Sequence, residues 1–459
     1  MDCRIKEFSW ERPLWELYAQ IYTRKYNFFL YSSLPDHPDS RFSYMGCDPY
    51  IVIRSTGDQN TIHKDGIIEK KTCSPFDCVQ ECLSNGPLRF DSDILPENIF
   101  FGGAVGYWGY DLKDLLEKLP SHASRTFDVP DAFWMFYRAV IVIDHRVQKK
   151  YFIGDPVQVG QLEAAILPGF EVPTKPKSFE YQVSTTVSEK EYAQKIESIK
   201  DSIACGDVYE VNLTQRFRLF FQEGEPWRDF WMFKSLTETS PAPFSAILKC
   251  NDFFVISSSP ERFLKIVEGQ AESRPIKGTR PRGGSWDEDE ANFLDLYFSD
   301  KDRAENVMIV DLVRNDLGRV SETGSVGVKD LFKIEKYSTV FQMISTIYSR
   351  LKNDLNAIDA IKAGFPPGSM TGAPKISAMN IIENLEPLKR GVYSGALGYM
   401  SFDGNCDLSV IIRTLITKGQ EGYFQTGGAI VWDSVAEQEY RECWDKARGI
   451  LQALENLKL

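Results

Sequence analysis

The side chains best suited to chemistry in this chain are one loop lysine and two pairs of carboxylates. Lys277 lies in the segment Arg-Pro-Ile-Lys-Gly-Thr, and a lysine acts as a nucleophile when its amine is unprotonated. A single lysine is usually a solvated surface charge, so the interpretation depends on the acidic residues elsewhere. Those residues stand three positions apart on two separate segments: Asp302 and Glu305, then Glu439 and Glu442.

The repeated acidic spacing predicts a divalent-cation site. Residues three apart on a helix lie one above the other, so each pair shares a face if its segment is helical. Glu305 and Glu442 are enough to hold a Mg²⁺ ion that keeps several waters and takes other ligands from an anionic substrate, with Asp302 and Glu439 behind them. Either pair alone would be read as a solvated helix face, and the repetition favours the metal. All four histidines precede residue 146, so acid-base chemistry in the second region must use other groups.

Three further features predict anion binding. Arg413 lies in the otherwise apolar stretch 410–415, read as a strand, where a guanidinium needs an internal acid or a substrate carboxylate. The glycine-rich stretch 364–375 runs into a predicted helix, whose N-terminus attracts anions, although a plain tight turn fits equally well. Gly427 and Gly428 at a strand end could bring backbone N–H groups onto a carboxylate, or could relieve crowding.

Composition predicts a globular chain with a sizeable core. Of the 459 residues, 43% are hydrophobic and 26% are charged, as in ordinary soluble proteins. The net charge of −12 and the lack of a basic cluster exclude nucleic acid as the expected partner. No apolar run reaches the roughly 20 residues of a spanning helix and no signal core opens the chain, so no membrane association and a cytoplasmic location are expected. Nine scattered cysteines without a Cys-x-x-Cys pair read as reduced thiols.

Apolar periodicity predicts two regions. Residues 1–170 contain short alternating apolar runs between turn residues and read as mainly β. The polar, proline-containing stretch 171–187 reads as a linker. The second region, 188–455, opens with the capping box of Ser188 and Glu191 ahead of a helical stripe. Both regions are expected to form one compact unit.

The second region contains the elements expected to position the candidate site. Residues 300–318 read as a helix that places the first acidic pair on one face. The C-terminal segment reads as a helix that stacks the second acidic pair with Lys446. Segments 392–402 and 408–417, with a further strand from Gly422, read as an antiparallel meander.

Several ordered motifs together resemble the chorismate-utilising enzymes. This family includes the large subunits of anthranilate synthase and aminodeoxychorismate synthase, and isochorismate and salicylate synthases. The likeness spans nearly the whole chain. It is densest in five segments: Gly206–Leu213, Ser259–Phe263, Asp311–Gly318, Ser369–Lys375 and Ile412–Thr414.

The loop around Lys277 is similar to one branch of the family. Anthranilate synthases typically read Pro-Ile-Ala-Gly-Thr, whereas many aminodeoxychorismate synthases have lysine at the alanine position, as this chain does. The segment 30–42 also looks more like the aminodeoxychorismate branch. One departure concerns Gln342, which stands where anthranilate synthases carry histidine. A glutamine cannot act as the acid or base that imidazole provides.

The resemblance implies how the substrate is held. Magnesium on the two glutamates named above would take the ring carboxylate of chorismate, helped by Lys446 and by backbone N–H groups near Gly427 and Gly428. Arg413 and Tyr393 would grip the enolpyruvyl carboxylate, a bidentate task that suits arginine. Three further residues would contact the substrate: Gly278, Thr279 and Ser369.

The resemblance also implies the chemistry. Lys277 would attack C2 with loss of the C4 hydroxyl, and ammonia would then add at C4 and expel the lysine, giving 4-amino-4-deoxychorismate for para-aminobenzoate and folate synthesis. Glu261 is the expected general acid, and a salt bridge to Arg262 or Arg280 is its alternative interpretation. A dry cationic pocket containing Arg413 and the metal would lower the pKa of Lys277.

The expected fold is α+β, with two large antiparallel sheets packed together, helices outside, and the site between strands and flanking helices. A separate glutaminase subunit would supply ammonia, because no Cys-His-Glu arrangement is visible. A pocket near Ser32 and Pro241 loosely matches the place where related subunits bind tryptophan. Two alternatives stay open: an anthranilate synthase large subunit, and a non-catalytic sensor of an aromatic amino acid.

Overall fold

The strands form two large antiparallel sheets. The computed structural model describes residues 3–86, 99–167, 169–176, 179–222, 226–337 and 340–458. Within these ranges each sheet contains 12 strands, and all pairings between these strands are antiparallel. Antiparallel sheets of this kind need only short connections between neighbouring strands.

The first sheet, called sheet A, has the strand order β1-β10-β9-β3-β2-β13-β14-β23-β24-β12-β11, with β20 beside β12. Its strands, in chain order, are β1 (Arg4–Phe8), β2 (Tyr26–Tyr31), β3 (Phe42–Cys47), β9 (Ala139–Asp144), β10 (Lys149–Gly154), β11 (Tyr181–Thr185), β12 (Glu210–Phe221), β13 (Phe244–Cys250), β14 (Phe253–Ser259), β20 (Gly372–Ala373), β23 (Thr414–Lys418) and β24 (Glu421–Ile430).

The second sheet, called sheet B, has the strand order β17-β19-β16-β15-β22-β21-β7-β8-β4-β5-β6, with β18 beside β19. Its strands, in chain order, are β4 (Ile51–Thr56), β5 (Gln59–Lys64), β6 (Ile67–Thr72), β7 (Gly103–Trp108), β8 (Ala132–Tyr137), β15 (Arg262–Val267), β16 (Gln270–Arg274), β17 (Ile276–Pro281), β18 (Gly327–Lys336), β19 (Val340–Arg350), β21 (Ala396–Ser401) and β22 (Cys406–Val410).

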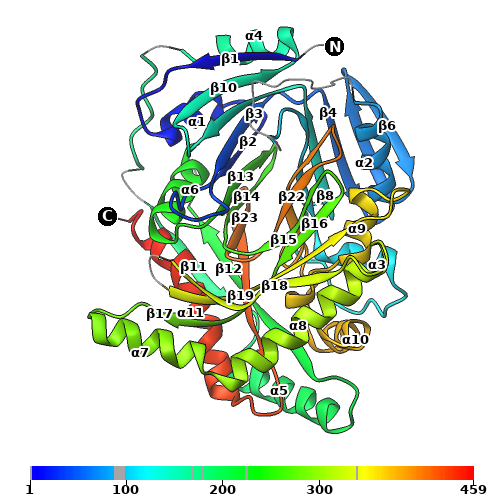
Figure 1. Ribbon diagram of the computed structural model, residues 1–459. Coiled ribbons are helices and arrows are strands. Elements are labelled where there is room, and N and C mark those ends of the chain that lie inside the picture. Colours follow the sequence, from blue (N-terminus) through cyan, green and yellow to red (C-terminus); the bar gives the residue numbers. More distant parts are fainter. Residues whose placement is uncertain are drawn as a thin grey trace.

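The two sheets pack face to face, and the larger helices cover their outer faces (Figure 1). An apolar core joins inward side chains of both sheets, such as Leu248 and Val255 of sheet A with Val105 and Leu397 of sheet B. A second core lies between sheet A and α1 (Leu14–Tyr22), α4 (Pro156–Ala164), α6 (Arg228–Thr239) and α11 (Ala436–Glu455). A third lies between sheet B and α2 (Pro75–Ser84), α8 (Asp300–Gly318) and α9 (Ala357–Gly364). The α+β sandwich expected from the sequence is confirmed.

The remaining α-helices of the described residues are α3 (Lys113–Leu116), α5 (Glu189–Ala204), α7 (Trp286–Tyr297) and α10 (Lys375–Leu385). Three of these four contact strands that carry the site, α5 and α10 at β12 and α7 at β17. The predicted capping box opens α5: Ser188 Oγ accepts from the Glu191 N–H, and Glu191 accepts from the Ser188 N–H. The helix predicted over 300–318 has those bounds, and its first turn is capped by Ser299, which accepts from the Asp302 N–H at 3.2 Å.

Both sheets mix strands from the two regions that composition separates. In sheet A, β2 pairs with β13, and in sheet B, β7 pairs with β21. Part of the expected linker, Tyr181–Thr185, forms β11 at the edge of sheet A. The boundary near residue 170 therefore does not divide the sheets.

The predicted meander is wrong at one place that matters for the site. The stretch read as one strand, 408–417, is two strands in different sheets: β22 ends at Val410 in sheet B, and β23 begins at Thr414 in sheet A. The chain crosses between the sheets over residues 411–413, and Arg413 has a φ of 49°. A left-handed backbone is rare for a non-glycine residue, and an apolar run gives no sign of it. The crossing places Arg413 between the sheets instead of inside a strand.

Candidate active site

One deep cleft brings together most of the predicted site residues. It has a volume of about 930 Å³ and lies between the ends of both sheets, α8 and α11. Among the expected site residues, its walls include Glu261, Lys277, Gly278, Thr279, Asp302, Glu305, Ser369, Tyr393, Arg413, Gly427, Glu439, Glu442 and Lys446. These residues are far apart in sequence, so only the fold assembles them.

Lys277 is buried and paired with a carboxylate that the sequence reasoning gave no role. Its Nζ lies 2.5 Å from Glu210 Oε1, and Glu210 has no solvent exposure. Burial lowers the pKa of Lys277, but Glu210, together with Glu305, outweighs burial and raises it above the ordinary value. The expected lowering of this pKa is therefore wrong, because the nearest charges are anions. Glu210 stands within the motif 206–213, so its position in that motif was the available signal.

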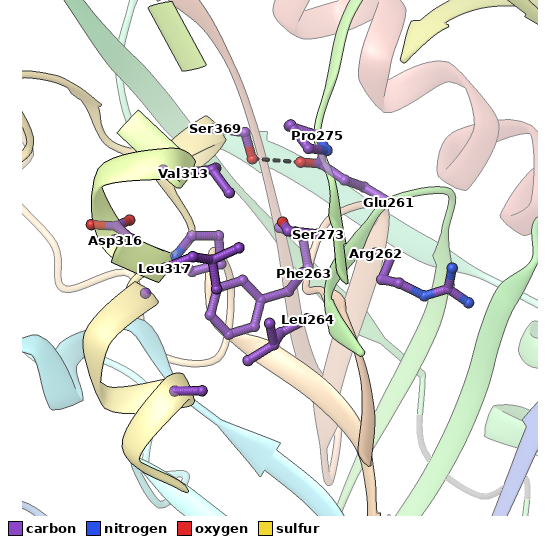
Figure 2. A pocket seen from close by; sticks show the side chains of 15 residues that line it. Glu261, Arg262, Phe263, Leu264, Ser273, Pro275, Val313, Asp316, Leu317 and Ser369 are labelled. Carbon is purple, nitrogen blue, oxygen red and sulfur yellow. Dashed lines mark hydrogen bonds between the residues drawn. The ribbon is translucent and has the colours of Figure 1, made fainter. Parts of the chain in front are cut away.

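Glu261 has the environment of a general acid. It is buried just before β15, where the chain passes from sheet A to sheet B, and Ser369 Oγ donates to its Oε1 at 2.6 Å (Figure 2). Burial raises the pKa of Glu261 to about 7, although the Ser369 hydrogen bond and Lys277 oppose the rise. The neighbouring Arg262 is directed away and pairs with Asp39, Glu272 and Asp407. The alternative of an ion pair between Glu261 and Arg262 or Arg280 is absent from the described residues.

Buried cations hold the loop that carries Ser369. Lys375 Nζ donates to Gly364 O at 2.8 Å and to Pro366 O at 3.0 Å, and it pairs with Asp316 at 2.6 Å. Arg390, the most deeply buried arginine of this wall, donates to Met370 O at 2.6 Å. These bonds satisfy backbone carbonyls that would otherwise be costly to bury. They fix the loop so that the Ser369 hydroxyl meets Glu261.

The four expected acidic residues line the cleft but differ in their surroundings. Glu305 on α8 is buried, with burial raising its pKa to about 7, and its nearest cation is Lys301 Nζ at 3.9 Å. Glu442 on α11 is about half exposed and pairs with Lys446 at 2.7 Å. Burial acts to raise the pKa of Glu442, and Lys446 overcomes it so that the net change is downward. Glu439 is buried and accepts from Ser434 Oγ at 2.7 Å.

These carboxylates fit a hard divalent cation that keeps other ligands. Glu305 makes no hydrogen bond with other described residues, so a cation would compensate its buried charge. Within the described ranges no group of three or more His, Cys, Asp or Glu side chains is arranged to hold a metal by itself. Asp302 is engaged elsewhere, since Arg280 Nη2 donates to it at 3.0 Å.

Arg413 presents an unpaired guanidinium to the cleft. Its side chain makes no ion pair or hydrogen bond with any residue that the structure describes, and burial lowers its pKa despite nearby Tyr337 and Glu261. Tyr393 is buried in the same wall. A desolvated arginine without an internal partner needs an external anion. Arg413 does not lie inside a strand as predicted, but its buried guanidinium still requires an anion.

Gly427 and Gly428 of β24 have different roles in the cleft. Gly427 lines the cleft, and its carbonyl accepts from Lys446 Nζ at 2.8 Å. A Cβ on Gly428 would lie 3.0 Å from Glu439 Oε2 and 3.6 Å from Glu442 Oε1, so this glycine makes room for the carboxylates. Both glycines lie inside β24 and pair with β12. The expectation that they stand at the end of a strand is therefore wrong.

Gln342 also lines the cleft, on β19 opposite Thr279. Its side chain is buried, and its Oε1 has no hydrogen-bond donor among the described residues. No histidine lines the cleft in the part of the chain that the structure describes. Proton transfer within these walls therefore falls to carboxyl and amine groups.

A second pocket of about 200 Å³ lies between the sheets, away from the cleft. Ser32 lines it, with its Oγ donating to Phe42 O at 2.8 Å. Pro241 does not line it, and Pro243 does. Among the described residues no helix is long and apolar enough to cross a membrane.

Comparison with known proteins places this fold and cleft in one class. A crystal structure of anthranilate synthase component I from Streptococcus pneumoniae superposes with a TM-score of 0.76 at 32% identity, covering 90% of this chain and 93% of that one. Aminodeoxychorismate synthase component 1 from Klebsiella aerogenes is 36% identical, over 96% of each chain. Anthranilate synthase component 1 from Acetivibrio thermocellus is 35% identical, over 91% of this chain and 87% of its own.

Residues 27–452 match the model of the family described as chorismate binding enzyme. The chain belongs to this family.

Proposed function

We propose that this chain aminates chorismate at C4 with ammonia to give 4-amino-4-deoxychorismate, for para-aminobenzoate and folate synthesis. The observation that carries the proposal is a buried lysine, Lys277, which Glu210 holds in the cleft that Glu261 also lines. The similarity to relatives named aminodeoxychorismate synthase component 1 supports it.

The cleft offers separate places for the two carboxylates of chorismate. Arg413, with Tyr393 beside it, would bind the enolpyruvyl carboxylate. Glu305 and Glu442 would hold Mg²⁺, which when bound supplies positive charge for the ring carboxylate. Lys446 would stay between Glu442 and the Gly427 carbonyl, adjacent to that carboxylate. Gly278, Thr279 and Ser369 would complete the contacts, with Glu439 and Asp302 behind the metal ligands.

The first chemical step needs a neutral lysine. With an ordinary pKa near 10.4, only about 1% of lysines are neutral at pH 8.5, and the pKa of Lys277 is raised further. Glu210, in contact with the ammonium, would therefore accept its proton as the substrate enters. Lys277 Nζ then forms a bond to C2, the ring double bonds shift, and the C4 oxygen leaves as water with the proton of Glu261.

Two partners complete the proposal. Ammonia would come from a separate glutaminase subunit, consistent with the words "component 1" in the names of the relatives. The second pocket would take tryptophan or a similar aromatic amino acid beside Ser32.

Anthranilate synthesis is the second candidate, because relatives of nearly equal identity carry that name. It requires a further step that eliminates pyruvate. Gln342 disfavours this step, because its amide offers neither a general acid nor a base in the cleft.

The test is to incubate the purified chain with chorismate, Mg²⁺ and an ammonium salt at mildly alkaline pH and to identify the product by mass spectrometry. We expect a product that keeps the enolpyruvyl group. Lys277→Ala should abolish it, and Lys277→Arg, which keeps the charge beside Glu210 but is not nucleophilic, should do the same. Anthranilate with free pyruvate would refute the assignment, and full activity of either variant would refute the covalent role.

A further inference from the structure

Two buried acceptor atoms on β12 lack donors among the described residues. Glu210 Oε2 and Asn212 Oδ1 are both buried and have no hydrogen-bond partner among the described residues. Glu210 is fully buried, and Asn212 is 7% exposed. Buried acceptors without donors are uncommon, since each costs about 1–3 kcal/mol. Two of them together indicate a ligand that donates hydrogen bonds.

The two atoms belong to neighbouring side chains on one face of β12, and one of these side chains, Asn212, lines the cleft. Glu210 and Asn212 are two residues apart on β12, so their side chains project from one face of sheet A. Asn212 lines the cleft directly, as does Lys277, which contacts the other oxygen of Glu210. The free Glu210 oxygen is therefore next to the amine that the proposed reaction uses.

The orientation of the Asn212 amide follows from its neighbour. Asn212 Nδ2 donates to Ser369 O at 3.1 Å, and a carbonyl oxygen can only accept. The opposite orientation would place two acceptors together. Oδ1 is therefore the atom left without a partner. The backbone here is also fixed, because the Asn212 N–H donates to Thr371 O at 2.9 Å and Arg390 donates to Asn212 O at 2.7 Å.

We propose that Glu210 Oε2 and Asn212 Oδ1 form the binding site for ammonia, the second substrate of the proposed amination. This inference rests on the function proposed above and deepens it. Ammonia has three N–H donors and one lone pair, so two acceptors can hold it while the lone pair remains directed at the ring. The chorismate carboxylates can only accept hydrogen bonds, and the C4 hydroxyl, which can donate one, leaves as water before ammonia adds.

The site completes the second chemical step. The nitrogen lone pair of ammonia forms a bond to C4, the ring double bonds shift back, and the bond from C2 to Lys277 Nζ breaks with its electron pair going to Nζ. Lys277 then takes back the proton that Glu210 received, which restores their ion pair. The new C4 ammonium gives one proton to the Glu261 carboxylate, which lost its own to the departing water.

The experiment measures the KM for ammonium and the KM for chorismate separately in the full-length chain, with the other substrate and Mg²⁺ saturating. Asn212→Ala should raise the KM for ammonium at least tenfold and leave the KM for chorismate within twofold. Asn212→Ser, which keeps a polar group too short to reach the same point, should behave alike. The covalent adduct on Lys277 should accumulate in both variants when ammonium is scarce, as seen in the intact mass.

Gln452→Ala is the matched control. Gln452 also lines the cleft, but its amide donates to Asn456 at 2.9 Å, and it stands ten residues after Glu442 on α11. Its loss should leave both KM values unchanged. An unchanged ammonium KM in Asn212→Ala, or equal rises in both KM values, would overturn the ammonia site. Failure of the wild-type chain to aminate chorismate would instead overturn the proposed function.

Discussion

The hydrogen bond from Ser369 to Glu261 should set the upper pH limit of the reaction. Glu261 donates a proton in the proposed first step, so the protonated form is the active one. That form is present below a pKa of about 7 and is lost as pH rises through it. Ser369 Oγ donates to Glu261 Oε1 at 2.6 Å, which favours the ionised carboxylate and lowers this pKa.

Removing the hydroxyl by Ser369→Ala should therefore shift the alkaline limb of the pH profile, the range in which kcat/KM falls, to higher pH. A hydrogen bond to a charged group contributes about 1.5–3 kcal/mol, and 1.36 kcal/mol corresponds to one pKa unit. Because Lys277 and other donors remain near Glu261, the lower end of this range applies, and we expect a shift of about one unit. The limb should move from about pH 7 to about pH 8.

The assay is kcat/KM for chorismate as a function of pH, with the concentration of free ammonia held constant. Thr371→Val serves as the control, because Thr371 is in the same loop and its hydroxyl donates to Gly368 O, not to Glu261. This control should keep the wild-type limb. If the limb is unmoved in Ser369→Ala, or moves equally in both variants, Glu261 is not the acid that the profile reports.

Three further predictions concern binding. Glu305 would bind the proposed metal as a carboxylate, and this form is lost as pH falls through its pKa of about 7. The Mg²⁺ concentration for half-maximal rate should therefore rise about tenfold per pH unit below that value, and a flat response would remove Glu305 from the ligand set. Arg413→Lys should raise the KM for chorismate about tenfold or more through loss of a bidentate contact, as measured by steady-state kinetics. Gly428→Ala should weaken the Mg²⁺ response several-fold, because its Cβ would lie 3.0 Å from Glu439 Oε2; circular dichroism should show an intact fold.

Sequence periodicity predicted the helices of the site well, because each helix carries its own local signals. The capping box of α5 and the bounds of α8 are set by residues within a few positions of each other. The i, i+3 acidic pairs then follow from helix geometry alone. For the same reason the sequence alone places Glu305 on α8, and Glu439 and Glu442 together on α11.

The features that the sequence did not predict all depend on contacts between distant segments. The pKa of Lys277 is decided by Glu210, which is 67 positions away in sequence, and no local pattern pairs them. The crossing at Arg413 arises because the residues before it pair in sheet B and those after it pair in sheet A. Both parts of this run are apolar, so the sequence does not show where the chain changes sheet. For Gly428 the sequence leaves two roles open, a backbone donor or relief of crowding, and its closeness to the α11 carboxylates favours the second.

The interleaving of early and late strands restricts how this chain can be divided. A fragment starting at residue 188 would lack β2 and β7, and so would leave β13 and β21 with one long unpaired edge each. Exposed apolar edges of this kind pair with other copies and aggregate. The cleft residues nearly all follow residue 188, yet a shortened catalytic fragment should be insoluble, and engineering of this protein should keep its first 170 residues.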